Sequence, residues 1–223
     1  MARKRQARKP ASTPINPMSA VPRFRPKNQE QAVAKRLCDT ETITVLSGPA
    51  GTAKTYCAIA SAVDAMIAGR VKSILLTRPA IEACGERMGY LPGAADEKLG
   101  VYISPLTDAI GKYCRGTPWE SQVMQMTTIV PRAYMRGRTL DNTVCIMDEA
   151  QNATAEQIKM FLTRIGEGSS MILAGDTEQS DISATPLKDI ARKISQVDGV
   201  EWLDFSEAAI VRHPIISEVL KWL

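Results

Sequence analysis

The stretch that decides the fold class is TITVLSGPAGTAKT, residues 42–55. Its apolar first half, TITVLS, predicts a buried strand, and the glycine-rich turn GPAGTAKT ends that strand. Lys54 and Thr55 then open a largely apolar helix that we expect to end near Ala68. A strand that runs through such a turn into a helix predicts a phosphate-binding loop, because the backbone N–H groups of the turn and of the helix N-terminus attract anions.

The side chains of this loop indicate its ligands. Lys54 is expected to reach the β- and γ-phosphates of ATP, and the Thr55 hydroxyl is expected to bind Mg²⁺. Ala53 stands where the P-loop pattern GxxxxGK[ST] has its second glycine. Because this position begins the helix, we expect an ordinary negative φ that alanine adopts without strain. The residues expected to bind the nucleotide are Gly48, Pro49, Ala50, Gly51, Thr52, Ala53, Lys54 and Thr55.

Strands and helices are expected to alternate along the rest of the chain. Apolar runs bounded by turn residues predict strands at 42–47, 73–77, 143–147 and 170–174 and near 200–204. Helices are expected near 28–38, 54–68, 97–113, 119–126, 154–165, 186–197 and 215–220. This alternation predicts parallel βαβ units in a sheet that helices cover on both faces. The expected fold class is therefore α/β.

Acidic side chains follow two of the expected strands. Asp148 and Glu149 end the apolar run in VCIMDEAQN, and LAGDTEQSD follows the next strand. Parallel strands end at the edge where the phosphate loop lies, so Asp148 is expected to hold Mg²⁺ through water and Glu149 to act as the base for the attacking water. In one interpretation the second turn places Gln179 or Asp176 near the γ-phosphate; in the other it is a solvated loop in which Asp176 caps a turn.

Residues 1–27 form a basic segment rich in Pro, Ser and Ala. The 223-residue chain carries 28 Lys and Arg against 24 Asp and Glu, and eight of these cations precede the first acid, Glu30. We expect this segment to be disordered in isolation. It serves either as a solubilising tail or as an arm that pairs with nucleic-acid phosphates. The globular domain is expected over residues 28–223.

Neither a secretory leader nor a membrane partner is expected. The basic first residues are not followed by an apolar core, and no apolar run approaches the ~18–20 residues that cross a bilayer. The five cysteines are scattered without a CxxC pair, which favours reduced thiols in a cytoplasmic protein over a zinc site. Cys57 and Cys145 lie in apolar stretches and are expected in the core.

The chain resembles the PhoH-like (phosphate-starvation-inducible) ATPases. The stretches that carry this resemblance are GPAGTAKT, LTRPAIEACGERMGYLPG, MRGRTL, DEAQN, KMFLTRIG and IVRHP. The combination of GPAGTAKT, DEAQ and GDTEQ is also similar to the motor core of superfamily-1 helicases. The resemblance implies a single RecA-like domain that binds ATP and forms a hexameric ring, with RNA or single-stranded DNA as its partner.

The helicase resemblance also implies roles for individual residues. Gln179 would sense the γ-phosphate, and Gln31 would read adenine. Arg78, in Thr77-Arg78-Pro79, resembles the residue that grips the nucleic-acid backbone. For this arginine, as for the others below, a surface ion pair or a structural hydrogen bond is the default interpretation.

Further arginines are candidates for functions between subunits. Superfamily-1 helicases close a second domain on the first, and that domain supplies an arginine to the γ-phosphate. Because this chain has room for one such domain, we expect a neighbouring subunit to supply the arginine in trans. Arg212 is the first candidate, with Arg136, Arg138 and Arg164 behind it. Arg136 and Arg138 are also tentative nucleic-acid contacts.

The residues leave two other functions open. A small P-loop kinase acting on a nucleotide or metabolite would share the loop and the first acid. Glu149 disfavours this alternative because a kinase must keep an activated water away from the γ-phosphate, and no Arg-rich lid is evident. The second alternative is a nucleotide-binding switch with little turnover.

Overall fold

The computed structural model of this protein describes residues 22–79, 95–130, 139–176 and 187–211, with side chains in the second range from residue 104 onward. Its strands are β1 (Ile43–Ser47), β2 (Ser73–Thr77), β3 (Thr127–Ile129), β4 (Thr143–Met147), β5 (Ser170–Ala174) and β6 (Val200–Asp204). Its helices are α1 (Gln29–Thr40), α2 (Lys54–Ile67), α3 (Ala95–Cys114), α4 (Glu120–Gln125), α5 (Ala155–Leu162) and α6 (Leu187–Ile194), with short 3-10 turns η4 (Ala150–Asn152) and η5 (Glu207–Ala209). Every strand expected from the sequence is present, and β3 is an addition. The helix expected near 215–220 lies outside the described residues.

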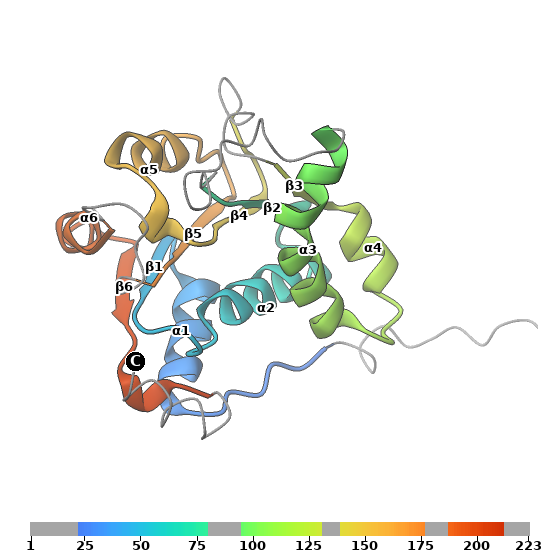
Figure 1. Cartoon of the computed structure of the whole chain (residues 1–223), viewed down its shortest axis with the longest axis horizontal. Helices are drawn as coiled ribbons and strands as arrows, with labels where there is room; N and C mark the ends of the chain where they lie inside the picture. Colours follow the sequence, from blue (N-terminus) through green and yellow to red (C-terminus); the bar gives the residue numbers. More distant parts are fainter. Residues whose placement is uncertain (1–21, 80–94, 131–138, 177–186, 212–223) are drawn as a thin grey trace, which may run out of the picture.

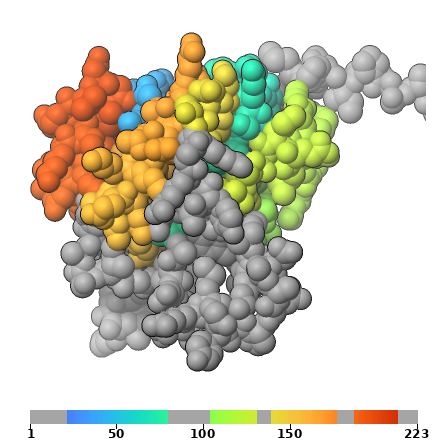
Figure 2. All heavy atoms as spheres, turned by 90° about the horizontal axis from the view of Figure 1, so that it is seen from above, coloured from blue at the N-terminus to red at the C-terminus, as the bar shows by residue number. Residues whose placement is uncertain are grey.

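The described strands form one parallel sheet in the order β3-β2-β4-β5-β1-β6. β5 therefore lies between β1, which leads into the phosphate loop, and β4, which leads into the acidic pair. Figure 2, seen from above, shows the chain around β6 (orange-red) on one side of the described part of the molecule and the chain of α3 and α4 (green) on the other. The predicted fold class, an α/β domain with a parallel sheet, is confirmed. In the described ranges no helix is long and apolar enough to cross a bilayer.

Alternate residues of the strands enter two separate cores, because successive side chains of a strand point to opposite faces of the sheet. Leu46 and Ile146 pack with α1, α2 and α3 on one face. Val45 and Cys145 pack with α5 and α6 on the other, and Figure 1 shows these two helical layers. Cys57 and Cys145, which were expected in the core, are fully buried.

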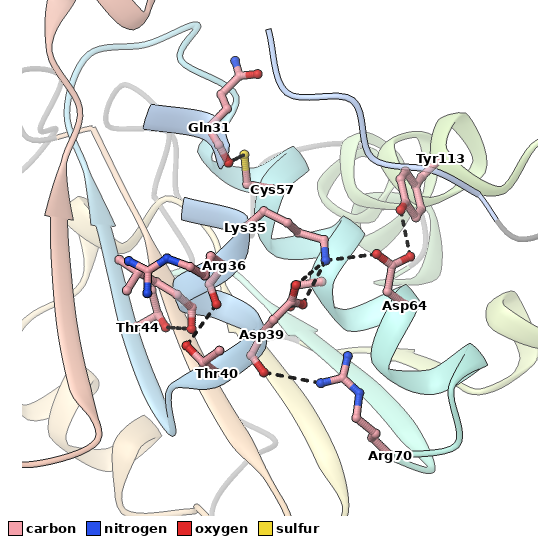
Figure 3. A network of polar contacts seen from close by, with 12 residues as sticks. Gln31, Lys35, Arg36, Asp39, Thr40, Thr44, Cys57, Asp64, Arg70 and Tyr113 are labelled. Atoms are coloured by element: carbon pink, nitrogen blue, oxygen red, sulfur yellow. Dashed lines mark hydrogen bonds and ion pairs between the residues drawn. The ribbon is translucent and has the colours of Figure 1, made fainter. Parts of the chain in front are cut away.

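A polar network anchors α2 to both of its helical neighbours (Figure 3). The Nζ atom of Lys35 in α1 lies 2.7 Å from an Asp39 oxygen and 3.0 Å from an Asp64 oxygen in α2. The Tyr113 hydroxyl of α3 donates a hydrogen bond of 2.8 Å to Asp64. Burial by itself would lower the pKa of Lys35, but its contacts with Asp39 and Asp64 raise that pKa above its ordinary value. The network therefore holds the helix that follows the phosphate loop.

Part of the predicted tail packs against the domain. The Phe24 ring lies 6.0 Å from the Tyr56 ring, between centroids, and is partly buried against the core. The backbone N–H of Lys27 donates to Gln31 Oε1 at 2.9 Å. Residues 22–27 therefore lie against α1 and α2, and the rest of the tail, residues 1–21, lies outside the described ranges.

Candidate active site

Strands β1, β4 and β5 end at one edge of the sheet, beside a cavity of about 280 Å³. Parallel α/β sheets place ligands at this edge because the loops that follow the strands diverge there. Three sequence stretches that are far apart along the chain supply the residues around the cavity. They are Ala50, Gly51, Ala53, Lys54, Thr55, Asp148, Glu149, Ala174, Gly175 and Asp176.

The phosphate loop depends on glycine at its first position. Gly48 has a φ of 122°, and a Cβ atom there would lie 2.5 Å from the Phe205 carbonyl oxygen, so only glycine fits. The loop then turns back over the N-terminus of α2, where the Lys54 Nζ donates to the carbonyls of Gly48 and Pro49 at 2.7 and 2.8 Å. Lys54 is only 8% exposed. Its ammonium group is thus already held at the loop, where it fits the role of a phosphate contact.

The expectation for Ala53 is wrong. Its φ and ψ are 71° and 28°, in the left-handed region, and it precedes the first residue of α2 without a side-chain cap. The loop reverses direction at this residue before the helix starts. Helical backbone angles therefore begin at Lys54 and not, as expected, at Ala53. An alanine in this conformation is strained by about 1–2 kcal/mol. The usual glycine of the motif would avoid this strain.

Gln31 lies behind the phosphate loop. Its Nε2 donates to the Thr52 carbonyl at 3.2 Å, while its Oε1 accepts the Lys27 N–H. The side chain is 3% exposed. Gln31 therefore supports the loop from α1, and its role as a reader of adenine stays a prediction.

Three side chains meet where magnesium is expected. The Thr55 hydroxyl donates to Asp148 Oδ1 at 2.5 Å. Arg78 donates from Nε and Nη2 to Asp148 Oδ2, at 2.9 and 2.5 Å. A hydroxyl and a carboxylate supply oxygen ligands of the kind that Mg²⁺ prefers, so Thr55 and Asp148 fit the predicted metal site. Arg78 therefore forms an ion pair inside this site, and its contact with nucleic acid stays a prediction.

Glu149 follows Asp148 with an unusual backbone. Its φ of 54° and ψ of 38° are left-handed, a conformation that costs a non-glycine residue about 1–3 kcal/mol and is frequent at active sites. Its carboxylate oxygen Oε2 accepts a hydrogen bond of 2.8 Å from Gln151 Nε2. Glu149, which is expected to act as the base, therefore borders the cavity, and a hydrogen bond from Gln151 holds its carboxylate.

Gly175 and Asp176, which directly follow β5, line another side of the cavity. Asp176 is buried, and its backbone N–H donates to Gln151 Oε1 at 2.9 Å. Asp176 therefore belongs to the site, as one of the two sequence interpretations expected. Gln179, three residues further, lies outside the described ranges.

Of the four arginines considered as candidates for the finger, the described residues include Arg164 alone. Arg136, Arg138 and Arg212 lie outside the described residues. Arg164 follows α5, where its carbonyl accepts the Leu140 N–H at 2.9 Å and its buried Nε has no hydrogen-bond partner among the described residues. Arg164 is not among the residues that line the cavity.

The sequence did not indicate Gln151 as a site residue. For Arg78 the sequence left two interpretations open, a nucleic-acid contact and an ion pair or structural hydrogen bond, and the structure shows an ion pair with Asp148. A signal for Arg78 does exist, because it follows a strand directly and the ends of parallel strands share one edge.

The fold and the site define a P-loop NTPase domain of the RecA-like class, with a phosphate loop after β1 and an acidic pair after β4. The chain belongs to the PhoH family, because the family model described as "PhoH-like protein" matches residues 23–223. A PhoH-like protein of Bacillus subtilis is 44% identical over 179 residues, which cover 78% of this chain and 56% of that protein. This chain thus spans little more than half the length of that relative.

Solved structures with the same fold are much more distant in sequence. The large terminase of a thermophilic bacteriophage, in complex with ADP, has a TM-score of 0.55 at 10% identity, covering 88% of this chain and 50% of the terminase. The Sulfolobus solfataricus SWI2/SNF2 ATPase core in complex with dsDNA has a TM-score of 0.50 at 12% identity, covering 86% of this chain and 47% of that one. At such identities the similarity establishes the fold alone.

Proposed function

We propose that this protein hydrolyses ATP with Mg²⁺ at the cavity beside β1, β4 and β5. The observation that carries the proposal is that Lys54, Thr55, Asp148 and Glu149 all border this one cavity. These are the residue types that phosphoryl transfer needs, since the reaction depends on positioning and on neutralising charge. A chance glycine-rich turn would not place a lysine, a hydroxyl and two acids from distant stretches around it.

Each residue has a distinct task in this proposal. The loop N–H groups and Lys54 bind the phosphates. Thr55 and Asp148 would hold Mg²⁺, which neutralises phosphate charge when it is bound. Glu149 orients the attacking water and takes its proton.

The test is phosphate release by the wild-type protein with ATP, in Mg²⁺ and in EDTA. We expect release that requires Mg²⁺ and is lost in Lys54→Ala, because that variant lacks the phosphate contact. Lys188→Ala is the matched control, since Lys188 pairs with Asp204 at the protein surface. Wild-type protein that binds ATP and releases no phosphate would contradict the proposal and support the switch.

We further propose that hydrolysis is coupled to RNA or single-stranded DNA in the cytoplasm. The basic residues 1–27 support such a partner, because cations bind phosphates without reading sequence. The described cysteines Cys38, Cys57, Cys114 and Cys145 are free thiols, which suits a reducing compartment. Phosphate release should be measured with and without single-stranded oligonucleotides. Adding candidate phosphate acceptors to the same assay tests the kinase alternative.

The third part of the proposal is a homo-oligomer, a hexameric ring, in which a neighbouring subunit supplies an arginine. Its support is that the described chain forms a single sheet, while an arginine finger raises the rate by ~10³–10⁵. Arg212 is the first candidate. The residue before it, Val211, donates its N–H to the Gly51 carbonyl of its own loop at 3.0 Å.

That contact makes a mixing experiment informative. Arg212→Ala subunits retain a complete phosphate site, and Lys54→Ala subunits retain the arginine. If Arg212 acts in trans, mixing the two inactive variants should restore activity at the interfaces that combine a good site with a good arginine. If Arg212 serves its own subunit, the mixture stays inactive.

A further inference from the structure

The amide of Gln151 joins two parts of the site. Gln151 is 2% exposed. Its Oε1 accepts the Asp176 N–H at 2.9 Å, and its Nε2 donates to Glu149 Oε2 at 2.8 Å. Because a backbone N–H can only donate, it fixes Oε1 on its own side, and the NH₂ group must then face Glu149. The orientation of the amide is thus determined by the backbone of Asp176.

The fit around this amide is tight. A Cβ atom on Gly175 would lie 2.9 Å from both the backbone nitrogen and the Oε1 of Gln151. It would also lie 2.6 Å from Leu187 Cδ2. The glycine before Asp176 therefore allows the loop to approach Gln151 closely enough for the hydrogen bond to form.

The hydrogen bond from Gln151 has a consequence for Glu149. It holds the Oε2 atom in place, so that in the proposed hydrolysis the other oxygen, Oε1, would accept the proton of the attacking water. Glutamate has three rotatable side-chain bonds, so a carboxylate without this donor would sample several positions. A misplacement of about 1 Å of a catalytic group can reduce a rate by ~10²-fold.

We propose that Gln151 is a positioning residue that orients the Glu149 carboxylate and makes this orientation depend on the backbone of Asp176, directly after β5. A displacement of the Asp176 backbone is transmitted through two hydrogen bonds to the proton-accepting carboxylate. The inference rests on the proposed hydrolysis, because it assigns Glu149 the proton.

Two variants of Gln151 separate positioning from folding. Gln151→Met has a similar volume and loses both hydrogen bonds. We expect kcat to fall by about 10–100-fold at saturating ATP, while the Kd for a non-hydrolysable ATP analogue changes less than about threefold. Gln157→Met is the control, because Gln157 caps α5 outside the cavity and its loss affects stability alone.

Gln151→Glu should change the pH dependence of kcat, which would stay the same if Gln151 had only a structural role. The new carboxylate keeps the acceptor for Asp176 and places a second negative charge against Glu149. Because like charges disfavour ionisation, the acid limb of the kcat profile should move to higher pH by about one unit. This variant is close in shape to wild type, so it answers the question even if Gln151→Met does not fold.

The outcomes are distinct. An active wild type with unchanged kcat in Gln151→Met, or with an unmoved acid limb in Gln151→Glu, would overturn the inference and leave the proposed function intact. A wild type that binds ATP without releasing phosphate would overturn both. A lower kcat with unchanged analogue affinity and a shifted acid limb would establish the role.

Discussion

Arg78 donates two hydrogen bonds to a single oxygen of Asp148, Oδ2, from Nε at 2.9 Å and from Nη2 at 2.5 Å. The Asp148 side chain is 4% exposed and that of Arg78 is 19% exposed. A buried carboxylate needs a compensating charge, and the arginine supplies it at the atom expected to hold magnesium through water. Binding of a nucleotide with Mg²⁺ must therefore either move Arg78 away from Asp148 or leave Asp148 in contact with both Arg78 and the magnesium site.

The first prediction follows from this ion pair. Arg78→Ala leaves the Asp148 carboxylate buried without its cation, which should lower the free energy of unfolding by about 3 kcal/mol in EDTA. With Mg²⁺ and ADP the loss should shrink, because the metal replaces the missing positive charge. Urea unfolding in the two buffers measures both values.

The matched control for this prediction is Arg192→Ala. Arg192 pairs with Asp189 in α6, but both side chains are about 70% exposed (69% and 71%), so its loss should change stability by less than ~1 kcal/mol. If Arg78→Ala lowered the free energy of unfolding in EDTA by as little as this control does, the ion pair with Asp148 would not stabilise the site.

The second prediction concerns the left-handed Ala53. Ala53→Gly should raise the free energy of unfolding by about 1 kcal/mol, because glycine adopts this φ without strain. The melting temperature should rise by ~2–4 °C. Ala32→Gly at an exposed position of α1 is the control, and it should instead lower stability by about 1 kcal/mol. Equal losses from both substitutions would contradict the left-handed conformation of Ala53.

The third prediction is a loss of stability at alkaline pH. Burial raises the pKa of Cys57 and of Cys145 from 9.0 to about 12, and that of Cys114 to about 11. The unfolded chain releases these protons near pH 9 while the folded chain keeps them, so the contribution of these thiols to stability is fully present below pH 9 and is lost as pH rises above it. Denaturant unfolding at pH 7.5 and pH 10 should show the fall.

Cys145→Ala tests the origin of this pH dependence. The variant should be less stable than wild type at pH 7.5 because it loses packing. Its further loss between pH 7.5 and pH 10 should be smaller than that of wild type by about 1 kcal/mol. An identical loss in both proteins would show that this thiol does not contribute.

The fourth prediction concerns residues 1–21, which carry five Lys and Arg and no acid. Deleting them should weaken binding to single-stranded RNA at low salt and flatten the slope of log K against log salt by about three units, since each paired phosphate contributes ~0.7. The deletion stops before Phe24 so that its contact with Tyr56 stays intact. Basal hydrolysis should be unchanged.

The solubilising-tail alternative predicts a different result for the same deletion. It expects an unchanged salt slope and lower solubility. The double substitution of the exposed Arg23 and Arg25 to glutamine controls for charge near the domain, and it should change the slope less than the deletion does.

Local patterns predicted much of this fold. The strand bounds Ser73–Thr77, Thr143–Met147 and Ser170–Ala174 agree with the sequence prediction, because these strands are buried on both faces and read as short, mainly apolar runs between turns. β3 escaped detection because its three residues carry two threonines and form too short a pattern to recognise.

The details of the site depended on tertiary structure. Arg78 reaches Asp148 because β2 lies beside β4 in the sheet. The order of the strands cannot be predicted from the sequence of either strand alone. The positive φ of Ala53 follows from the way the loop closes over α2, which residue type alone does not reveal. The motifs indicated Lys54, Thr55 and the pair Asp148–Glu149, which line the cavity, and the structure shows how these side chains are paired.

We propose that Glu149 activates the water that attacks ATP, and the variant Glu149→Gln tests this role most directly. The Kd for Mg²⁺–ATP and the single-turnover rate of phosphate release should be measured on the same preparation of Glu149→Gln, with Glu156→Gln on the exposed first turn of α5 as control. We expect the Kd of this variant for Mg²⁺–ATP to stay within about threefold of wild type. Its single-turnover rate of phosphate release should be at least ~100-fold lower, because the base is lost while the phosphate and magnesium ligands remain. Hydrolysis by Glu149→Gln at the wild-type rate would contradict this role.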